Sequence, residues 1–268
     1  MLEAICYCFH KQDSTVFSGK KAVQRGRDLR KSIGFFSGQT LVRFQNKNII
    51  STGHFIYFCH MNTFEDFIAV LRSKMVSSRL PGMKAQLKMA PAGRKSELST
   101  VAENPRESAV LISFFPKNNQ PHLVMIKRAV DKSVHSGQVS FPGGKAEKSD
   151  PSLKHTALRE AEEEVGITPS KVEVLGKLSN LYIPPSNFTV NPFVGFLTKE
   201  PDFVTNGEVD RLLIINWNQL TNPANTTVQR LQHRTGSVEA PCYLINGEII
   251  WGASAMILAE LIELFTSN

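Results

Sequence analysis

The sequence lacks the features of several protein classes. Its 268 residues contain no apolar run approaching the roughly 18 residues of a membrane-spanning helix. Its four cysteines form no paired CxxC spacing, which argues against a thiolate metal site and a disulfide framework. No internal repeat is apparent. The length gives room for one sizeable domain plus an appendage, and the contents of 41% hydrophobic and 21% charged residues are ordinary for a globular protein. The cysteine pattern indicates a reducing compartment.

Acidic residues are scarce only near the start of the chain. Residues 1–60 hold nine Lys or Arg against three Asp or Glu, whereas residues 61–268 hold 22 against 21. Six of the seven net positive charges therefore belong to the first segment. The near-neutral remainder does not indicate a nucleic-acid surface, so any electrostatic steering of an anionic ligand must be local.

The basic segment 1–60 also shows no sustained helical or strand periodicity. Met61 follows it, and Thr63 and Asp66 then have the spacing of a helix N-cap and its capping box. We predict that Met61 is the natural start, and that residues 1–60 are an artefact of start assignment or a poorly ordered extension. A targeting presequence is the rival interpretation, although the segment lacks an apolar h-region and a convincing amphipathic stripe.

The pattern after residue 61 mixes helices with strands. Apolar residues at 64, 67, 68 and 71 predict an amphipathic helix, and the Pro-, Gly-, Ser- and Lys-rich stretch 78–106 predicts an irregular segment. Later helices are expected at 151–165 and 253–265. Strands are expected at 108–115, 122–127, 138–141, 172–181, 189–197, 211–216, 239–245 and 248–251. Without regular βαβ alternation, this order suggests an α+β fold or an α/β/α sandwich.

The most informative stretch is a helix that gathers carboxylates on one face. Glu160, Glu163 and Glu164 are three or four residues apart, so they are neighbours on a helix. Like charges at this spacing repel by roughly 0.2–0.5 kcal/mol per pair. A hard divalent cation, Mg²⁺ or Mn²⁺, would compensate them. A solvated face is the ordinary alternative for a Glu-rich helix, and it suits Glu162, which is offset around the helix.

The surroundings of this helix favour metal and diphosphate over a solvated face. Gly143 and Gly144 precede it and permit close approach of backbone to a ligand. Arg159 can pair with a neighbouring carboxylate and fix its rotamer. Gly166, followed by Ile167 and Pro169, is a helix-stop signal. The order of these features predicts a site that holds a divalent metal against a diphosphate.

The stretch resembles the Nudix box, G-x5-E-x7-R-E-U-x-E-E-x-G-U, in which U is a bulky aliphatic residue. Its second half matches from Arg159 to Ile167, with Ala161 small for the first U. In the first half, the segment between Gly144 and Arg159 is one residue longer than in the general pattern, and its midway acid is Asp150. This longer loop with an Asp is similar to the coenzyme A diphosphatase branch of the Nudix hydrolases.

An upstream motif of that branch, R-S-x3-R-x3-G-x3-F-P-G-G, supports the resemblance. Arg128, Gly137 and Phe141-Pro142-Gly143-Gly144 fall at its spacings. Ala129 replaces the Ser and Ser133 replaces the second Arg. If that Arg binds a substrate phosphate in relatives, this chain needs a substitute. The candidates are Lys127, Lys132 and His135.

The resemblance covers roughly residues 61–268 and implies an α+β fold, a Nudix-type α/β/α sandwich with a mixed sheet, whose box spans about 143–167. It implies catalytic use of Mg²⁺ or Mn²⁺ by Glu160 and Glu164, with Glu163 as a third ligand or the holder of a metal-bound water. Arg159 would orient the carboxylates. Glu208, in a loop before a strand, resembles the distal acid of the family and is the candidate general base.

The resemblance also implies the substrate and its contacts. Coenzyme A or an acyl-coenzyme A would be cleaved to 3′,5′-ADP and 4′-phosphopantetheine or its acyl form. Another nucleoside diphosphate-linked substrate, such as ADP-ribose or NADH, is the alternative, and a non-catalytic binding module is a further one. A binder has no need to keep Arg159 and its acidic neighbours. The expected substrate-binding residues are Arg128, His135, Gln138, Gly143 and Gly144.

Partners and location follow from the same reasoning. We expect a small-molecule partner, coenzyme A or a related diphosphate, with no nucleic acid and no membrane, while a homodimer remains open. Isomerisation of a prenyl diphosphate is disfavoured because Cys242 lies far from the box in sequence. The C-terminus lacks a Ser-Lys-Leu peroxisomal signal, so the expected location is cytoplasmic.

Overall fold

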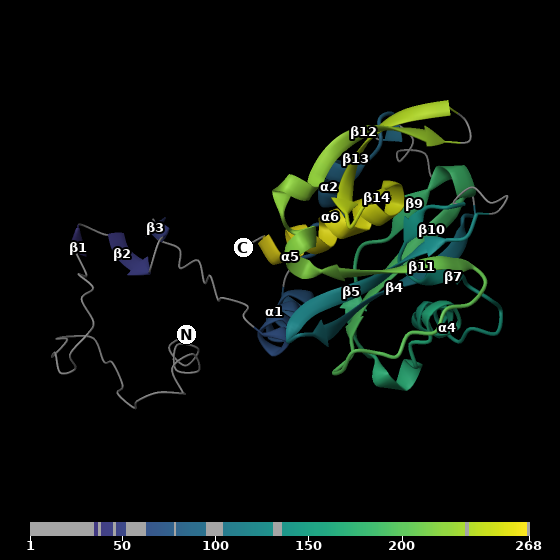
Figure 1. Ribbon diagram of the computed structural model, residues 1–268, viewed down its shortest axis with the longest axis horizontal. Helices are drawn as coiled ribbons and strands as arrows, with labels where there is room; N and C mark the ends of the chain where they lie inside the picture. Colours follow the sequence, from purple (N-terminus) through teal and green to yellow (C-terminus); the bar gives the residue numbers. More distant parts are fainter. Residues whose placement is uncertain are drawn as a thin grey trace. The chain divides into compact units, whose positions relative to one another are not determined.

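The computed structural model describes residues 63–77, 79–94, 104–130, 136–233 and 236–266, together with three strands between residues 35 and 51. The chain divides into two units, Met1–Cys59 and His60–Asn268, which are described separately (Figure 1). In the first unit, the strands pair antiparallel in chain order. They are β1 (Phe35–Phe36), β2 (Gln39–Phe44) and β3 (Lys47–Ser51).

The second unit is built on a mixed sheet with the strand order β11-β5-β4-β10-β8. Its long strands are β4 (Arg106–Lys117), β5 (Gln120–Arg128), β8 (Glu173–Lys177), β10 (Phe188–Phe196) and β11 (Val209–Asn216). β4 and β10 are parallel, and the other pairs are antiparallel. Three short strands pair with the long ones: β6 (Val139–Ser140) with β5, β7 (Gly143–Lys145) with β4, and β9 (Leu181–Ile183) with β10.

A second, antiparallel sheet has the order β12-β13-β14. Its strands are β12 (Thr226–His233), β13 (Gly236–Ile245) and β14 (Glu248–Trp251). The β13–β14 turn is Asn246-Gly247, with φ of 53° and 80°, so both residues have the left-handed conformation that an Asn-Gly hairpin turn requires. The sequence predicted this hairpin but not β12, whose mainly polar residues give no apolar alternation.

Helices cover both faces of the main sheet. Figure 1 shows α4 (Leu153–Val165) on one side and α6 (Gly252–Thr266) on the other, with α1 (Phe64–Ser77) on the α6 side. The expected α/β/α sandwich with a mixed sheet is therefore confirmed. The shorter helices are α2 (Gly82–Gln86), η3 (Leu87–Met89), η4 (Pro169–Lys171), η5 (Pro184–Ser186), α5 (Trp217–Leu220) and η6 (Pro223–Asn225). No helix within the described ranges is long and apolar enough to span a bilayer.

The central strand β4 is buried on both faces, which explains its continuous apolar run. Ile112 and Phe114 belong to the core on the α6 side, whereas Leu111 and Phe115 belong to the core under α4. A strand packed on both faces cannot alternate apolar with polar residues. The run therefore predicted a buried strand correctly.

The N-terminal helix α1 begins as predicted. The Asp66 N–H donates to Thr63 Oγ1 at 3.1 Å, and the Thr63 N–H donates to Asp66 Oδ2 at 3.2 Å, which completes a reciprocal cap. Phe64, Phe67 and Leu71 are buried on its inner face. The predicted periodicity is confirmed.

The prediction of an irregular segment at 78–106 was partly wrong, because α2 and η3 lie within it. The cause is a tertiary contact. The Gly82 N–H and the Gln86 side-chain amide both donate to the buried carboxylate of Glu260 on α6, at 3.2 and 2.8 Å. The same carboxylate accepts the Ser179 N–H, in the break between β8 and β9, where one continuous strand was expected.

Candidate active site

The acid-bearing helix α4 is fixed at both ends by its own sequence. Ser152 is the N-cap, and its Oγ accepts the His155 N–H at 3.3 Å. Gly166 ends the helix at φ 73°, with its N–H directed to the last carbonyls. Ala157, Ala161 and Val165 are buried, so they anchor one face to the sheet. The small side chain at 161 lies in this buried face.

Glu164 binds the glycine loop directly. Its Oε2 accepts the Gly143 N–H at 2.8 Å, and its Oε1 accepts from Arg128 Nη1 at 3.2 Å. The side chain is only 2% exposed. Burial raises its pKa to about 7, against the opposing effects of the Gly143 hydrogen bond and the Arg128 charge. Repulsion from Glu160 and Glu208 acts in the same direction as burial.

Close approach of other atoms leaves no room for a side chain at either loop glycine, but the obstacle differs: it is backbone at Gly143 and the end of a flexible side chain at Gly144. A Cβ at Gly144 would lie 2.5 Å from the carboxylate of Glu160, and one at Gly143 would lie 2.4 Å from the Ala109 carbonyl oxygen. At Gly143 the backbone itself would have to shift, whereas at Gly144 the Glu160 carboxylate would have to turn away. Glu160 has a raised pKa, first because of burial and then because of repulsion from Glu163 and Glu208, while Arg159 opposes the shift.

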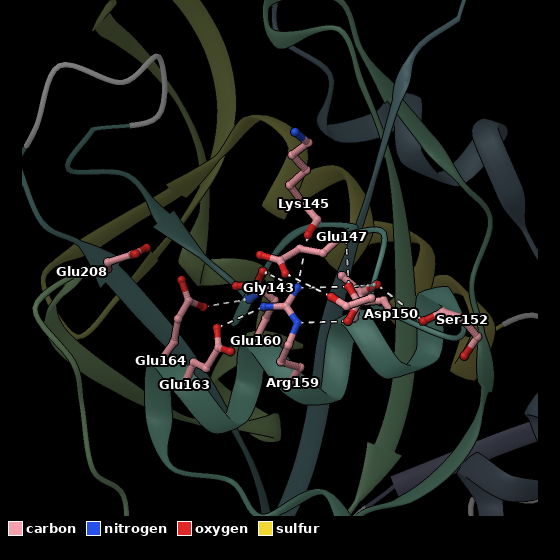
Figure 2. Close-up of polar contacts among 12 residues, drawn as sticks. Gly143, Lys145, Glu147, Asp150, Ser152, Arg159, Glu160, Glu163, Glu164 and Glu208 are labelled. Carbon is pink, nitrogen blue, oxygen red and sulfur yellow. Dashed lines mark hydrogen bonds and ion pairs between the residues drawn. The ribbon is translucent and has the colours of Figure 1, made fainter.

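Arg159 lies at the centre of an ion-pair network (Figure 2). Its Nε donates to Asp150 Oδ1, its Nη1 to Glu163 Oε2 and its Nη2 lies beside Glu160 Oε1, each at 3.0 Å. Nη2 also donates to the Lys145 carbonyl at 3.3 Å. The guanidinium therefore ties the acidic helix to the loop, and its orienting role in catalysis stays a prediction.

Sequence reasoning assigned no role to Asp150, the midway acid of the longer loop. Its side chain is 6% exposed and accepts from Thr156 Oγ1 at 2.9 Å and from the Glu147 N–H at 3.0 Å, besides Arg159. The hydrogen bond from Arg159 is the main reason why its pKa lies well below the ordinary value. Asp150 thus anchors the loop, and only its position midway between the glycines and Arg159 hinted at this.

The distal acid Glu208 approaches the box through Arg128. Glu208 Oε2 lies 3.5 Å from Arg128 Nη2, and the Glu208 carbonyl accepts the Ala129 N–H at 2.8 Å. The Glu208 side chain is 66% exposed. Arg128 therefore links a buried carboxylate, Glu164, to an accessible one.

The structure brings together eight of the residues predicted for the site. They are Arg128, Gly143, Gly144, Arg159, Glu160, Glu163, Glu164 and Glu208. Gln138 joins them through its carbonyl, which accepts the Arg128 N–H at 3.0 Å. His135, Ser133 and Lys132 lie outside the described residues. Glu162 is exposed, as expected.

Lys127 is a poor candidate to replace the second Arg of the upstream motif as a phosphate ligand. Its Nζ forms an ion pair with Glu248 Oε2 at 2.7 Å, and Arg211 pairs with the other oxygen of the same carboxylate. The charge of Lys127 is thus used in joining β5 to β14.

The donor set fits a hard divalent cation in kind and in charge. Five carboxylates in the network face only two guanidinium groups, those of Arg128 and Arg159, and Figure 2 shows the Lys145 amine directed away from them. Among the residues with described side chains, no three His, Cys, Asp or Glu groups are already arranged around a metal position. Glu163 and Glu164 instead contact the arginines, so binding a cation requires these side chains to turn.

A pocket of about 490 Å³ opens beside the glycine loop. Its polar end is formed by Arg128, Gln138, Gly143, Gly144 and Lys145. The same loop contacts Glu160 and Glu164, so the pocket and the carboxylate cluster share a wall. Much of the remaining wall comes from β13, η5 and the start of α6, segments that sequence reasoning did not connect with the site.

Comparison with known proteins identifies relatives. Residues 105–229 match the NUDIX domain family model. An uncharacterized Nudix hydrolase NudL of Photorhabdus laumondii is 32% identical over 179 residues, which cover 66% of this chain and 92% of that protein. The protein of the same name from Yersinia pestis strain Pestoides F is 39% identical over 161 residues, covering 59% and 79%. A solved Nudix hydrolase structure from M. Smegmatis, RenU, aligns with a TM-score of 0.44 at 16% identity, covering 62% and 89%.

Proposed function

Because the chain belongs to the Nudix hydrolase family, whose members act on diphosphate bonds, we propose that it is a metal-dependent pyrophosphohydrolase of coenzyme A or an acyl-coenzyme A. The products are 3′,5′-ADP and 4′-phosphopantetheine or its acyl form. The observation that supports this best is the glycine loop, which joins the carboxylate cluster to the polar end of the 490 Å³ pocket. If the diphosphate binds where the loop meets the carboxylates, the part of the substrate that is esterified to the diphosphate lies next to the pocket.

The roles of the residues follow from their contacts. Glu160 and Glu164 would hold Mg²⁺ or Mn²⁺, with Glu163 as the third donor once it leaves Arg159. When bound, the ion supplies charge neutralisation for a diphosphate and acidifies water. Arg159 holds the acidic helix and the glycine loop in a fixed position relative to each other. The exposed carboxylate of Glu208 receives the proton of the attacking water.

Arg128 is the proposed phosphate-binding residue. Its side chain is 24% exposed and lines the pocket, and its guanidinium contacts both Glu164 and Glu208. A bound phosphate can take over one of these contacts, because guanidinium forks match phosphate oxygens as well as carboxylate oxygens. Arg128 therefore couples the substrate to the proposed metal ligand and to the proposed base.

The coenzyme A assignment is supported by the upstream motif and its packing. Phe141 is 2% exposed in the α6-side core, and two residues later the Gly143 N–H binds Glu164. The Phe-Pro-Gly-Gly order thus anchors the loop in the core and presents backbone at the carboxylates. Ala129 and Ser133, where the motif departs, leave the phosphate contact to Arg128 and its neighbours.

The test is phosphoanhydride hydrolysis by the full chain with Mg²⁺ or Mn²⁺, against coenzyme A, ADP-ribose and NADH, with products identified by mass spectrometry. Glu164→Gln should lower kcat at least 100-fold. Glu162→Gln is the matched control, because Glu162 lies on the same helix but is exposed. Preference for ADP-ribose or NADH would replace the coenzyme A assignment. Tight binding of a diphosphate without turnover would favour the non-catalytic binding module.

A further inference from the structure

The pocket beside the glycine loop is apolar over most of its wall. Beyond the polar end, aliphatic and aromatic side chains dominate, from strands, η5 and α6 alike. Representative wall residues are Val110, Ile183, Phe188, Val190, Val238 and Ile257. Several of them belong to or pack against the α6-side core, so this part of the pocket is recessed into that core.

The wall is held in place by contacts that do not involve a ligand. Arg106 stacks over the Phe188 ring at 4.1 Å and donates through Nη2 to the Ser186 carbonyl at 2.7 Å, which fixes η5 against β10. The Ser254 hydroxyl donates to the Val139 carbonyl at 2.9 Å and joins α6 to β6. The pocket is therefore preformed, as small-molecule sites usually are.

Charge is distributed unequally along the pocket. Arg128 and Lys145 lie at the glycine-loop end, where phosphates belong. Arg94, elsewhere on the wall, donates through Nη2 to the Tyr182 carbonyl at 2.9 Å and thereby braces β9. A nucleobase placed among these aliphatic groups would lose hydrogen bonds to water, and only the serine hydroxyls that also line the wall, such as those of Ser140 and Ser237, could replace them. An alkyl chain has no hydrogen bonds to lose.

We propose that this pocket is a subsite for the acyl chain of the substrate, so that the enzyme acts on acyl-coenzyme A in preference to free coenzyme A. The inference rests on the proposed function and deepens it. The diphosphate lies at Gly143-Gly144, the pantetheine arm leads along the loop, and the acyl chain fills the recess between β13, β10 and α6. Each methylene that enters raises affinity about three- to four-fold until the pocket is full.

The test uses a fragment of the substrate that lacks the phosphoanhydride bond cleaved in the proposed reaction. Binding of S-acyl-4′-phosphopantetheine with chains of rising length is measured by calorimetry on the full protein, together with 3′,5′-ADP. Val238→Trp places an indole in the recess from β13, where Val238 is partly buried. Val228→Trp is the matched control, because Val228 is 63% exposed on neighbouring β12 and does not line the pocket.

In the wild-type protein and in Val228→Trp, affinity should rise with chain length and then level off. In Val238→Trp the ratio between long and short chains should fall at least ten-fold. Affinity independent of chain length in the wild type overturns the inference. So does a Val238→Trp variant that loses 3′,5′-ADP and keeps its chain-length dependence, because the base would then occupy the pocket.

The same probes separate this inference from the proposed function. Hydrolysis of coenzyme A with no chain-length effect on binding leaves the diphosphatase intact and removes the acyl subsite. Chain-dependent binding without hydrolysis of any coenzyme A ester keeps the apolar-tail subsite and removes the diphosphatase assignment.

Discussion

Replacing Glu164 by Gln should stabilise the metal-free protein while it abolishes activity. Glu164 is 2% exposed, and burial raises its pKa from the ordinary 4.5 to about 7. At 1.36 kcal/mol for each unit of pKa, ionising this carboxyl above pH 7 costs the fold about 3 kcal/mol. Gln can accept the Gly143 N–H as Glu does, but its amide group directs a donor towards the donor groups of Arg128, which offsets part of the stabilisation. We therefore expect the free energy of unfolding to rise by about 1–3 kcal/mol.

The size of this stabilisation depends on pH. A carboxyl with a raised folded-state pKa contributes its full stability below pH 4.5 and loses it as pH rises through about 7. In EDTA, the Gln variant should therefore melt above the wild type at pH 8, by roughly 2–4 °C per kcal/mol for a unit of this size. Its relative advantage should shrink as pH falls towards 4.5.

Thermal melts and urea titrations of the full chain between pH 4.5 and 8.5, in EDTA, measure the difference. Glu162→Gln, on the same helix and exposed, should show no such pH trend. Mg²⁺ should raise the melting temperature of the wild type and much less that of Glu164→Gln. A Gln variant whose stability relative to wild type is lower at pH 8 than at pH 5 would refute the reasoning, because the ion pair with Arg128 would then outweigh burial.

Three further variants test other contacts. Gly144→Ala should reduce kcat with little loss of stability, because its Cβ would lie 2.5 Å from the end of the Glu160 side chain and would displace that carboxylate. Gly207→Ala has open space and should leave both the melting temperature and the initial rate unchanged. Arg159→Met should cost about 3 kcal/mol in urea titrations by leaving Asp150 buried and unpaired. Since Arg159 depresses the pKa of Asp150, that difference is present above pH 3.8 and should shrink as the pH falls below it. Glu260→Ala should cost about 2–4 kcal/mol and expose α2 to proteolysis, since Glu260 accepts from Gly82, Gln86 and Ser179; unchanged cleavage would contradict this.

Local signals allowed the sequence to predict α4 and its acids. Ser152, Gly166 and the acid spacing all lie within one segment, so capping and helical periodicity specify both the helix and its acidic face. The Asn246-Gly247 hairpin was predictable for the same reason. These features depend on residues close together in the chain.

Features that depend on distant residues were missed. The anchoring role of Asp150 depends on how the loop folds back onto Arg159, and α2 depends on Glu260, more than 170 residues away in sequence. The apolar recess combines β13, η5 and α6, which no local pattern connects. The sequence therefore predicted the acidic cluster but not the pocket beside it.

The parallel pairing of β4 with β10 has a consequence for how the protein acquires activity. Ser108 pairs with Val190 and Phe114 with Phe196, and α4 lies in the connection between these strands. Closing such a long chain segment costs entropy before its contacts form, so this step is slow compared with helix formation. A nascent chain that has not yet released β10 from the ribosome holds the whole acidic motif but lacks the parallel partner strand of β4. Competence for catalysis should therefore appear late in synthesis and all at once.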